Sequence, residues 1–378
     1  MRRGPLALRG LLMVLAAIVA SPASFAQESE PALDIKPTPH LDVDIPLHAR
    51  GRSGDGVPVF EDAIEVGLRT YRVQAVDRRG VPIEGLGKRD FDVKLGDEFV
   101  NVERVVWVHA SSHGAEDGED TLRGVPGRFL LFVQAGREPF FGRAHLRLQR
   151  QIREFLDGLE PGAAVSVVSF DARLKLWVDF TRDLELVERV VSVAGRFTAE
   201  PGEQPAFEHD LPSLRRIWDP DLARRIQTAE HSLETMAHYL DDLHGTETMI
   251  YVGWGLHQFN RRNASRVLQF SRATETLADS GVQVFVLGAL KTDLQNLGHG
   301  LLELADTTGG AYFHSRNIPA WRMRELASSL SAHYLLTLDE EDLADAMRRE
   351  PKRDPHRDLE IRLRFRDGRV YGPPRPVH

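Results

Sequence analysis

The sequence contains no cysteine among its 378 residues. This absence excludes a lipid-anchored lipoprotein, a disulfide-linked scaffold, a zinc site with cysteine ligands and a cysteine nucleophile. A chain of this length can still be stabilised by its hydrophobic core, because the buried fraction of the surface rises with chain length.

Long hydrophobic runs are also missing. Leu11–Ala20 is an apolar stretch of 10 residues, which is short of the ~20 that a membrane-spanning helix needs, and no later segment approaches that length. The stretch Leu11–Ala20 follows three arginines and is itself followed by the small residues Ser24 and Ala26. This order is the pattern of a secretory signal. We predict that residues 1–26 are a signal peptide cleaved near Ala26, which leaves a periplasmic or secreted protein without a membrane span.

The chain lacks an excess of basic residues. Lys and Arg number 48 against 56 Asp and Glu, which gives a formal net charge of -8 and a pI near 6.0. Because nucleic-acid-binding proteins depend on a basic face, this balance argues against a nucleic-acid partner.

Motifs for enzymatic chemistry are missing as well. There is neither a G-x-S-x-G turn nor a G-x-x-x-x-G-K-[ST] loop. The chain has 15 histidines, but His231 and His238 would lie ~10 Å apart on a helix, too far to share a metal ion. We therefore predict a protein that is not an enzyme and holds no cofactor.

Two polar segments divide the chain. Residues 27–60, rich in Pro and Gly, are predicted to be a flexible linker, and residues 109–126 a second one. Between them, residues 61–108 alternate apolar and polar side chains as antiparallel strands do. So few strands cannot enclose a core, and we predict that a C-terminal hairpin within residues 339–378 joins them in one small β domain. The strands are expected at 64–76, 91–95, 100–105, 359–365 and 369–371.

Residues 127–338 alternate short apolar strands with amphipathic helices. Most of these strands are apolar at nearly every position and show no alternation of apolar and polar side chains, as expected for strands buried on both faces. Strands separated by helices of this length predict a doubly wound, mostly parallel sheet, so the fold class is α/β. The strands are expected at 129–134, 163–170, 174–180, 248–252, 282–288, 311–314 and 334–338. One long helix, from Asp219 to Gly245, carries an apolar seam that we interpret as one buried face.

Several local motifs follow one another in an order that is typical of one family. They are Val81–Val93 (VPIEGLGKRDFDV), Leu159–Gly162 (LEPG), Leu302–Gly310 (LELADTTGG) and Leu330–Leu336 (LSAHYLL). With these motifs the chain resembles a von Willebrand factor A domain, and more narrowly the VWFA-related exported proteins abundant in Acidobacteria. The resemblance covers about residues 60–375 and implies the same α/β fold and a role in protein recognition.

The resemblance also implies a metal site, and here the sequence departs from the family. Such domains hold Mg²⁺ or Mn²⁺ with D-x-S-x-S after the first strand, a threonine from a middle loop and an aspartate after a later strand. The matching positions are Gln134, Gly136, Glu138 and Trp254, with Thr198 or Thr181 as the only sources of the middle hydroxyl. One carboxylate and one neutral amide supply too little charge for a tight site, so we predict that at most weak Mg²⁺ or Mn²⁺ binding remains.

The carboxyl ends of the strands meet at one edge of such a sheet, called the crest here. The crest would bring 134–141 and 253–259 side by side, and aromatic residues are common anchors in protein interfaces. We predict that a protein partner binds there and that Ala in place of Trp254 and Phe141 abolishes binding with unchanged thermal stability. The alternative for each residue is that it packs beneath the loops. The candidates are Phe140, Phe141, Trp254, His257 and Phe259.

Three other functions stay open. One is a metal-dependent adhesion domain with an altered site, and another is a structural or assembly subunit of an envelope complex that uses exposed strand edges. An enzyme with an unrecognised site ranks last.

Overall fold

The computed structural model describes twelve segments of the chain. They are residues 69–78, 81–109, 121–123, 126–135, 141–203, 205, 208–243, 248–256, 264–289, 295–353, 358–364 and 368–372. The chain divides into two units, Met1–Ala63 and Ile64–His378, and all described residues belong to the second. The predicted signal peptide 1–26, the linker 27–60 and the start of the strand predicted at 64–76 lie outside the described residues.

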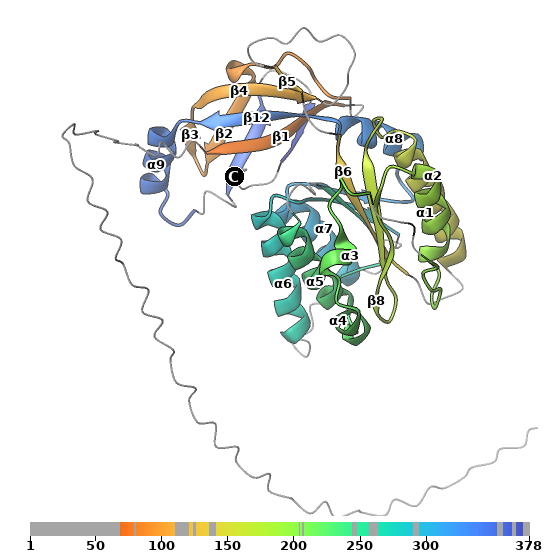
Figure 1. Cartoon of the computed structure of the whole chain (residues 1–378). Helices are drawn as coiled ribbons and strands as arrows, with labels where there is room; N and C mark the ends of the chain where they lie inside the picture. The colour runs from red at the N-terminus through yellow and green to blue at the C-terminus, as the bar shows by residue number, and fades with distance from the viewer. Residues whose placement is uncertain are drawn as a thin grey trace, which may run out of the picture. The chain divides into compact units, whose positions relative to one another are not determined.

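A six-stranded sheet is the centre of the α/β part (Figure 1). Its strand order is β11–β10–β9–β6–β7–β8, and all neighbours are parallel except β8, which runs antiparallel to β7. The order reverses at β6, which lies between β7 and β9, and this confirms the predicted doubly wound sheet. The strands are β6 Arg128–Gln134, β7 Ala164–Phe170, β8 Leu174–Thr181, β9 Thr248–Gly253, β10 Gln283–Gly288 and β11 Ala311–His314.

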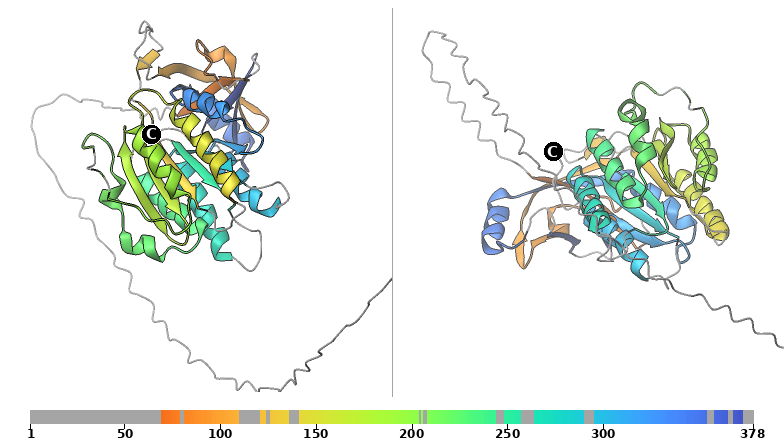
Figure 2. Two further views of the ribbon diagram at one scale, coloured as in Figure 1. Left: turned by 90° about the vertical axis from the view of Figure 1, so that its right-hand side faces the viewer. Right: turned by 90° about the horizontal axis from the view of Figure 1, so that it is seen from below.

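Helices cover both faces of this sheet (Figure 2). One face packs against α1 Phe141–Leu156, α2 Leu184–Ala194 and α8 Trp321–Ser329. The other packs against α3 Leu214–Ile217, α4 Pro220–Arg225, α5 Ala229–Asp242, α6 Ala264–Asp279 and α7 Gln295–Thr307. The apolar strand runs are buried because both of their faces meet a helical layer, as their composition predicted.

The long helix predicted from Asp219 to Gly245 is wrong in one respect, because it is two helices. The backbone of Ile226 is extended, and the Thr228 hydroxyl caps α5 by accepting a hydrogen bond from His231 N at 3.1 Å. Capping by Thr228 satisfies amides at the start of α5, so a break there costs little. The apolar seam survives the break, since Ile226, Leu233 and Met236 are all fully buried.

Two sheets form the small β part, and all their strand pairs are antiparallel except β4 with β5, which is parallel. A five-stranded sheet has the order β14–β1–β12–β4–β5, and a three-stranded sheet has the order β13–β2–β3. The N-terminal and C-terminal segments pair with each other, β13 with β2 and β14 with β1. The strands are β1 Thr70–Asp77, β2 Phe91–Leu95, β3 Glu98–Val100, β4 Val102–His109, β5 Thr121–Arg123, β12 Ala332–Leu338, β13 Leu359–Leu363 and β14 Gly368–Tyr371.

Two expectations about these strands are wrong. The strand predicted at 334–338 does not belong to the parallel sheet, because β12 pairs antiparallel with both β1 and β4. Residues 332–335 alternate between buried and half-buried, as expected for a sheet with one buried face, and the last three residues of β12 are all buried. The predicted C-terminal hairpin is instead two strands in different sheets, because β13 and β14 each pair with a strand from the N-terminal side. The same region also holds a helix that was not predicted, α9 Glu340–Arg349, which Asp339 caps.

No helix among the described residues is long and apolar enough to cross a membrane.

Candidate functional site

The crest is formed by the carboxyl ends of β6, β7, β9 and β10. Because these strands are parallel, the residues that follow them lie at one edge of the sheet. Hydrogen bonds continue across this edge beyond the strands, from Ala135 N to Phe170 O at 2.8 Å and from Ala289 N to Gly253 O at 2.9 Å. β6 also pairs with β9 as far as Val133 and Val252. The residues that end β6 and follow β9, Gln134 and Trp254, therefore lie side by side, as the sequence predicted.

Gln134 and Trp254 are joined directly by hydrogen bonds, which we call the Gln134 clasp. The Gln134 side-chain oxygen accepts from Trp254 N at 2.8 Å and from Gly255 N at 3.2 Å. Its side-chain nitrogen donates to Gly255 O at 3.1 Å, and the Trp254 indole donates to Gln134 O at 2.7 Å. Four hydrogen bonds between neutral groups thus connect the two strand ends where the family pattern places metal ligands.

The clasp also explains why glycine ends β9. A Cβ atom at Gly253 would lie 2.3 Å from Cε1 of Tyr251 and 2.8 Å from the side-chain oxygen of Gln134. Both distances are far below van der Waals contact, and Tyr251 is fully buried, so it has no room to move. Only glycine allows the amide of Gln134 to approach the β9 backbone this closely.

Trp254 is half-buried and packs against the core beneath α1 and α2. Its indole N–H is used within the clasp, so this side chain contributes to the structure of the crest. The expectation that Trp254→Ala leaves stability unchanged therefore needs revision, because the substitution removes both a hydrogen bond and packing.

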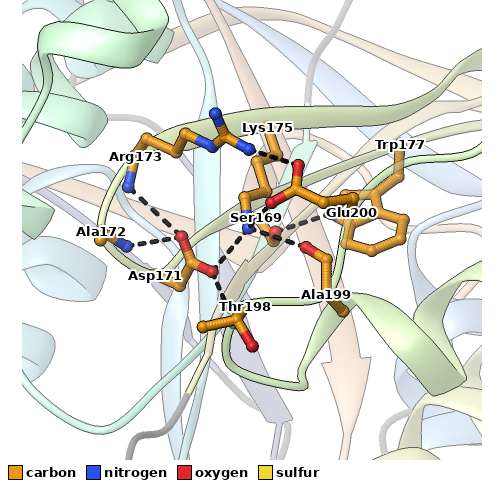
Figure 3. Close-up of polar contacts among 9 residues, drawn as sticks. All are labelled: Ser169, Asp171, Ala172, Arg173, Lys175, Trp177, Thr198, Ala199 and Glu200. Atoms are coloured by element: carbon orange, nitrogen blue, oxygen red, sulfur yellow. Dashed lines mark hydrogen bonds and ion pairs between the residues drawn. The ribbon is translucent and has the colours of Figure 1, made fainter.

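Beside the clasp, the turn between β7 and β8 holds a nearly buried ion pair (Figure 3). Lys175 Nζ lies 2.6 Å from Oδ2 of Asp171, and each side chain is only 4% exposed. The Asp171 carboxylate also accepts hydrogen bonds from Thr198 N at 3.0 Å and from Ala172 N. Burial alone would raise the pKa of Asp171, but these hydrogen bonds and the charge of Lys175 outweigh it, so the pKa is lowered and the carboxylate is ionised.

The ammonium group of Lys175 is surrounded by oxygen atoms (Figure 3). Besides Asp171 it contacts Ala199 O at 2.7 Å and Glu200 Oε1 at 3.3 Å, and Glu200 also pairs with Arg173. Two carboxylates and a carbonyl are groups that would suit a cation. Here a cation from the chain itself already neutralises them.

The two threonines proposed for the middle hydroxyl lie at opposite ends of the sheet. Thr198 is near the crest, has a positive φ of 65° and donates its backbone N–H to Asp171, while its hydroxyl points away from that carboxylate (Figure 3). Thr181 is opposite Val165 at the start of β7, and its hydroxyl donates to Glu208. Only Thr198 is near the crest, and it contributes its backbone there.

A second glutamine, which was not predicted as a site residue, fixes the loop after β11. Gln151 on α1 is only 1% exposed, and its nitrogen donates to Ser315 O at 2.9 Å and to Ile318 O at 2.8 Å. Its side-chain oxygen accepts from the Ser315 hydroxyl at 2.9 Å. A polar residue on the apolar face of a predicted amphipathic helix was the only available signal.

Most of the other predicted crest residues lie outside the described residues: Gly136, Glu138, Phe140, His257 and Phe259. Phe141 is the first residue of α1, and its side chain is not described. Within the described part of the chain, no group of three or more His, Cys, Asp or Glu residues is arranged to hold a metal ion.

No family model matches the sequence, and a comparison with curated proteins finds no match. Solved structures that are similar include a von Willebrand factor type A protein from Catenulispora acidiphila, with 12% identity over 65% of this chain and 51% of that chain and a TM-score of 0.39. This chain thus spans about half the length of that protein.

Two further similar structures come from other bacteria. The conserved hypothetical protein BatB from Bacteroides thetaiotaomicron has 13% identity over 59% of this chain and 99% of its own, with a TM-score of 0.33. The PilB minor pilin from Streptococcus sanguinis has 10% identity over 70% of this chain and 87% of its own, with a TM-score of 0.34. All three scores are low, so the fold described above rests on its own strand order and register.

Proposed function

We propose that this chain is an exported, non-enzymatic protein-interaction module of the von Willebrand factor A type, with a crest that works without a bound metal. The observation that carries the proposal is the Gln134 clasp. In a metal-dependent crest, a cation holds the ends of two neighbouring strands and completes its coordination with a group from the partner. The amide of Gln134 holds the same two strand ends with neutral hydrogen bonds.

The charges at the crest support the same proposal. The oxygen of Gln134 already accepts two hydrogen bonds. The carboxylates of Asp171, which follows β7, and of Glu200 are paired with Lys175. A divalent cation bound by these carboxylates would have to displace the ammonium of Lys175, which is costly because it leaves a buried positive charge unpaired.

Metal independence is tested by isothermal titration calorimetry and thermal unfolding of the protein in Mg²⁺, in Mn²⁺ and in EDTA. We expect no saturable heat and the same melting temperature in all three solutions. Saturable binding with a rise in melting temperature would overturn the proposal and favour the altered metal site, because a ligand of the folded state stabilises it.

Recognition is tested by crosslinking and capture from the native cell envelope in EDTA. We expect the same partner to be recovered with and without Mg²⁺, and to be lost with Phe140→Ala or Phe259→Ala. Phe99→Ala is the matched control, since Phe99 is 60% exposed on β3 and belongs to the small β part. Equal recovery with crest and control variants would contradict recognition by the crest aromatics.

Trp254→Phe adds a test that separates binding from stability. Phenylalanine keeps most of the packing beneath α1 and α2 but removes the hydrogen bond to Gln134 O. We expect a modest loss of stability of about 1 kcal/mol, with partner recovery reduced only if the crest conformation matters for binding.

A further inference from the structure

The six-stranded sheet has two edge strands, and they differ in how far they are covered. Every residue of β8 is buried. At the opposite edge, all residues of β11 are only half-buried, although the strand is apolar and aromatic up to His314. The less covered edge of the sheet is therefore β11.

The backbone of β11 alternates between β10 and the outer side of the sheet. Ser315 N donates to Gly288 O at 2.9 Å, which continues the parallel pairing of the two strands. Because successive residues of a strand direct their backbone groups to opposite sides, Ala311 and Phe313 bond to β10 in the same way as Ser315. The backbone groups of Tyr312 therefore point to the outer side, as edge strands require.

Some of the outward backbone groups are already used within the chain. Gly310 N donates to Ala305 O at 2.9 Å, and His314 O accepts from Asn317 N at 2.9 Å. The other outward groups of residues 310–314 have no hydrogen-bond partner within the described part of the chain. They are the C=O of Gly310, the N–H and C=O of Tyr312 and the N–H of His314.

These unpaired groups are self-complementary about a twofold axis that passes beside Tyr312. Opposed residues of an antiparallel pair exchange N–H···O bonds in both directions, so Tyr312 of one copy would donate to and accept from Tyr312 of a second copy. The His314 N–H would then donate to the Gly310 C=O of the second copy. The groups that this pairing does not need, the Gly310 N–H and the His314 C=O, are the ones already bonded within the chain.

The side chains also suit pairing with a second copy. In this register Phe313 is opposite Ala311 of the second copy, so a large side chain meets a small one, and the Tyr312 side chains are opposite each other. Cross-strand pairs of this kind stabilise a sheet. Residues 307–315 contain no Lys, Arg, Asp or Glu, so two copies can approach along this edge without repulsion between like charges.

Opposite charges flank this uncharged run. Asp306 precedes it and Arg316 follows it; both are exposed, and neither forms an ion pair with a residue that the structure describes. Antiparallel pairing sets the Arg316 end of each copy against the Asp306 end of the other. The charges thus favour the same orientation of a second copy as the backbone groups do.

We propose that two copies of this chain associate through β11 and join their six-stranded sheets into one continuous sheet across a twofold axis. The paired edge is short, so the dimer is weak and forms at about 10–100 µM. This surface is separate from the crest aromatics and goes beyond the proposed recognition of a protein partner at the crest.

The test is sedimentation equilibrium of the full mature chain from about 1 to 200 µM, where we expect a monomer–dimer equilibrium. His314→Pro should raise the dissociation constant by at least about tenfold, because proline has no N–H. Proline is tolerated where the N–H of an edge strand faces outward, so the pairing with β10 should persist. His314→Ala is the matched control, since it changes the same side chain but keeps the N–H, and it should stay within about threefold of the wild type.

Two further measurements do not depend on how well the proline variant folds. Arg316→Glu should weaken association because it sets two negative charges together, and adding Asp306→Arg to it should restore association. Both residues are exposed, so these changes leave the core intact. Amide hydrogen exchange of Tyr312 should slow as the protein concentration rises, while that of Phe313, which bonds to β10, should stay constant.

A monomer at every concentration up to about 200 µM would overturn the proposal and leave the β11 edge to a strand from another protein. Equal dissociation constants for His314→Pro and His314→Ala would also overturn it. So would a dimer in which the exchange of the Tyr312 amide does not change, because its interface would lie elsewhere. None of these results depends on metal binding or on the crest aromatics, so failure here is distinguishable from failure of the proposed function.

Discussion

Substitution of Gln134 by Ala is the most direct test of the clasp. The change removes three hydrogen bonds, from Gln134 to Trp254 N, Gly255 N and Gly255 O, at 2.8, 3.2 and 3.1 Å. A hydrogen bond contributes about 1 kcal/mol net to stability, and an unpaired buried group costs more. Since this site is half-buried and water can replace part of the loss, we expect the free energy of unfolding to fall by about 2–4 kcal/mol.

Two variants sharpen this experiment. Gln134→Glu keeps the shape and the oxygen that accepts from Trp254 N and Gly255 N, but it loses the donor to Gly255 O. We therefore expect an intermediate loss of about 1–2 kcal/mol. Gln227→Ala is the control, because Gln227 is exposed between α4 and α5, and exposed substitutions change stability by about 0.5 kcal/mol or less.

The measurement is urea unfolding at neutral pH, with the midpoint compared at constant slope. A Gln134→Ala unfolding midpoint that matches the midpoint of the Gln227→Ala control would refute the reasoning, because the clasp would then contribute nothing measurable to the free energy of unfolding. A change in slope would point instead to an altered unfolded or native state.

Three further predictions concern buried groups. Lys175→Met should lower the free energy of unfolding by about 3 kcal/mol at neutral pH, because it leaves the Asp171 carboxylate buried without its cation. Urea titrations should show this difference narrowing as the pH falls, because without Lys175 the Asp171 carboxylate takes up a proton at a higher pH than in the wild type. Burial, helped by the charge of Arg72, lowers the pKa of His333 from 6.5 to about 2, so between these values the unfolded chain binds the extra proton and stability falls as the pH drops. From about pH 7 to 5 the free energy of unfolding of the wild type should fall by at most about 2 kcal/mol because of this group, and His333→Gln should not show this fall. Equal pH profiles of unfolding free energy for the wild type and His333→Gln would contradict the prediction. Met236→Ala should cost about 2–5 kcal/mol, as measured by thermal unfolding, because the side chain is fully buried in the apolar seam.

Much of the α/β part was predictable from the sequence. The strands at Ala311–His314 and Thr248–Gly253 match the expected positions within one residue. Strongly apolar runs indicate strands that are buried, and amphipathic periodicity indicates helices with one buried face, so both kinds of element can be predicted from the sequence. The order of the elements was sufficient to predict a parallel sheet, because short right-handed crossovers leave few alternatives.

The errors occurred where local pattern and long-range pairing compete. The seam from Leu222 to Leu243 has helical spacing throughout, but Thr228 is also a good N-cap, and periodicity alone does not register such a break. The strand at 332–338 follows a helix like the others, yet its partners are β1 and β4, which are far away in the sequence. Only long-range pairing assigns it to the antiparallel sheet.

The crest illustrates the same division between sequence and structure. The sequence identified Gln134 and Trp254 as the positions where metal ligands were missing, but it suggested an exposed aromatic at Trp254. The structure shows that the two residues bond to each other, and that Gly253 makes room for this. Such a contact between residues 120 positions apart follows from strand register and has no local signature.

The sequence by itself determined the class of fold, the absence of cysteine chemistry and the position of the unusual crest, because composition and periodicity report directly on burial and on residue type. The tertiary structure alone decided what those residues do. It joined Gln134 to Trp254 and Lys175 to Glu200, because each of these contacts connects segments that are separate in the sequence and meet only in the packed fold.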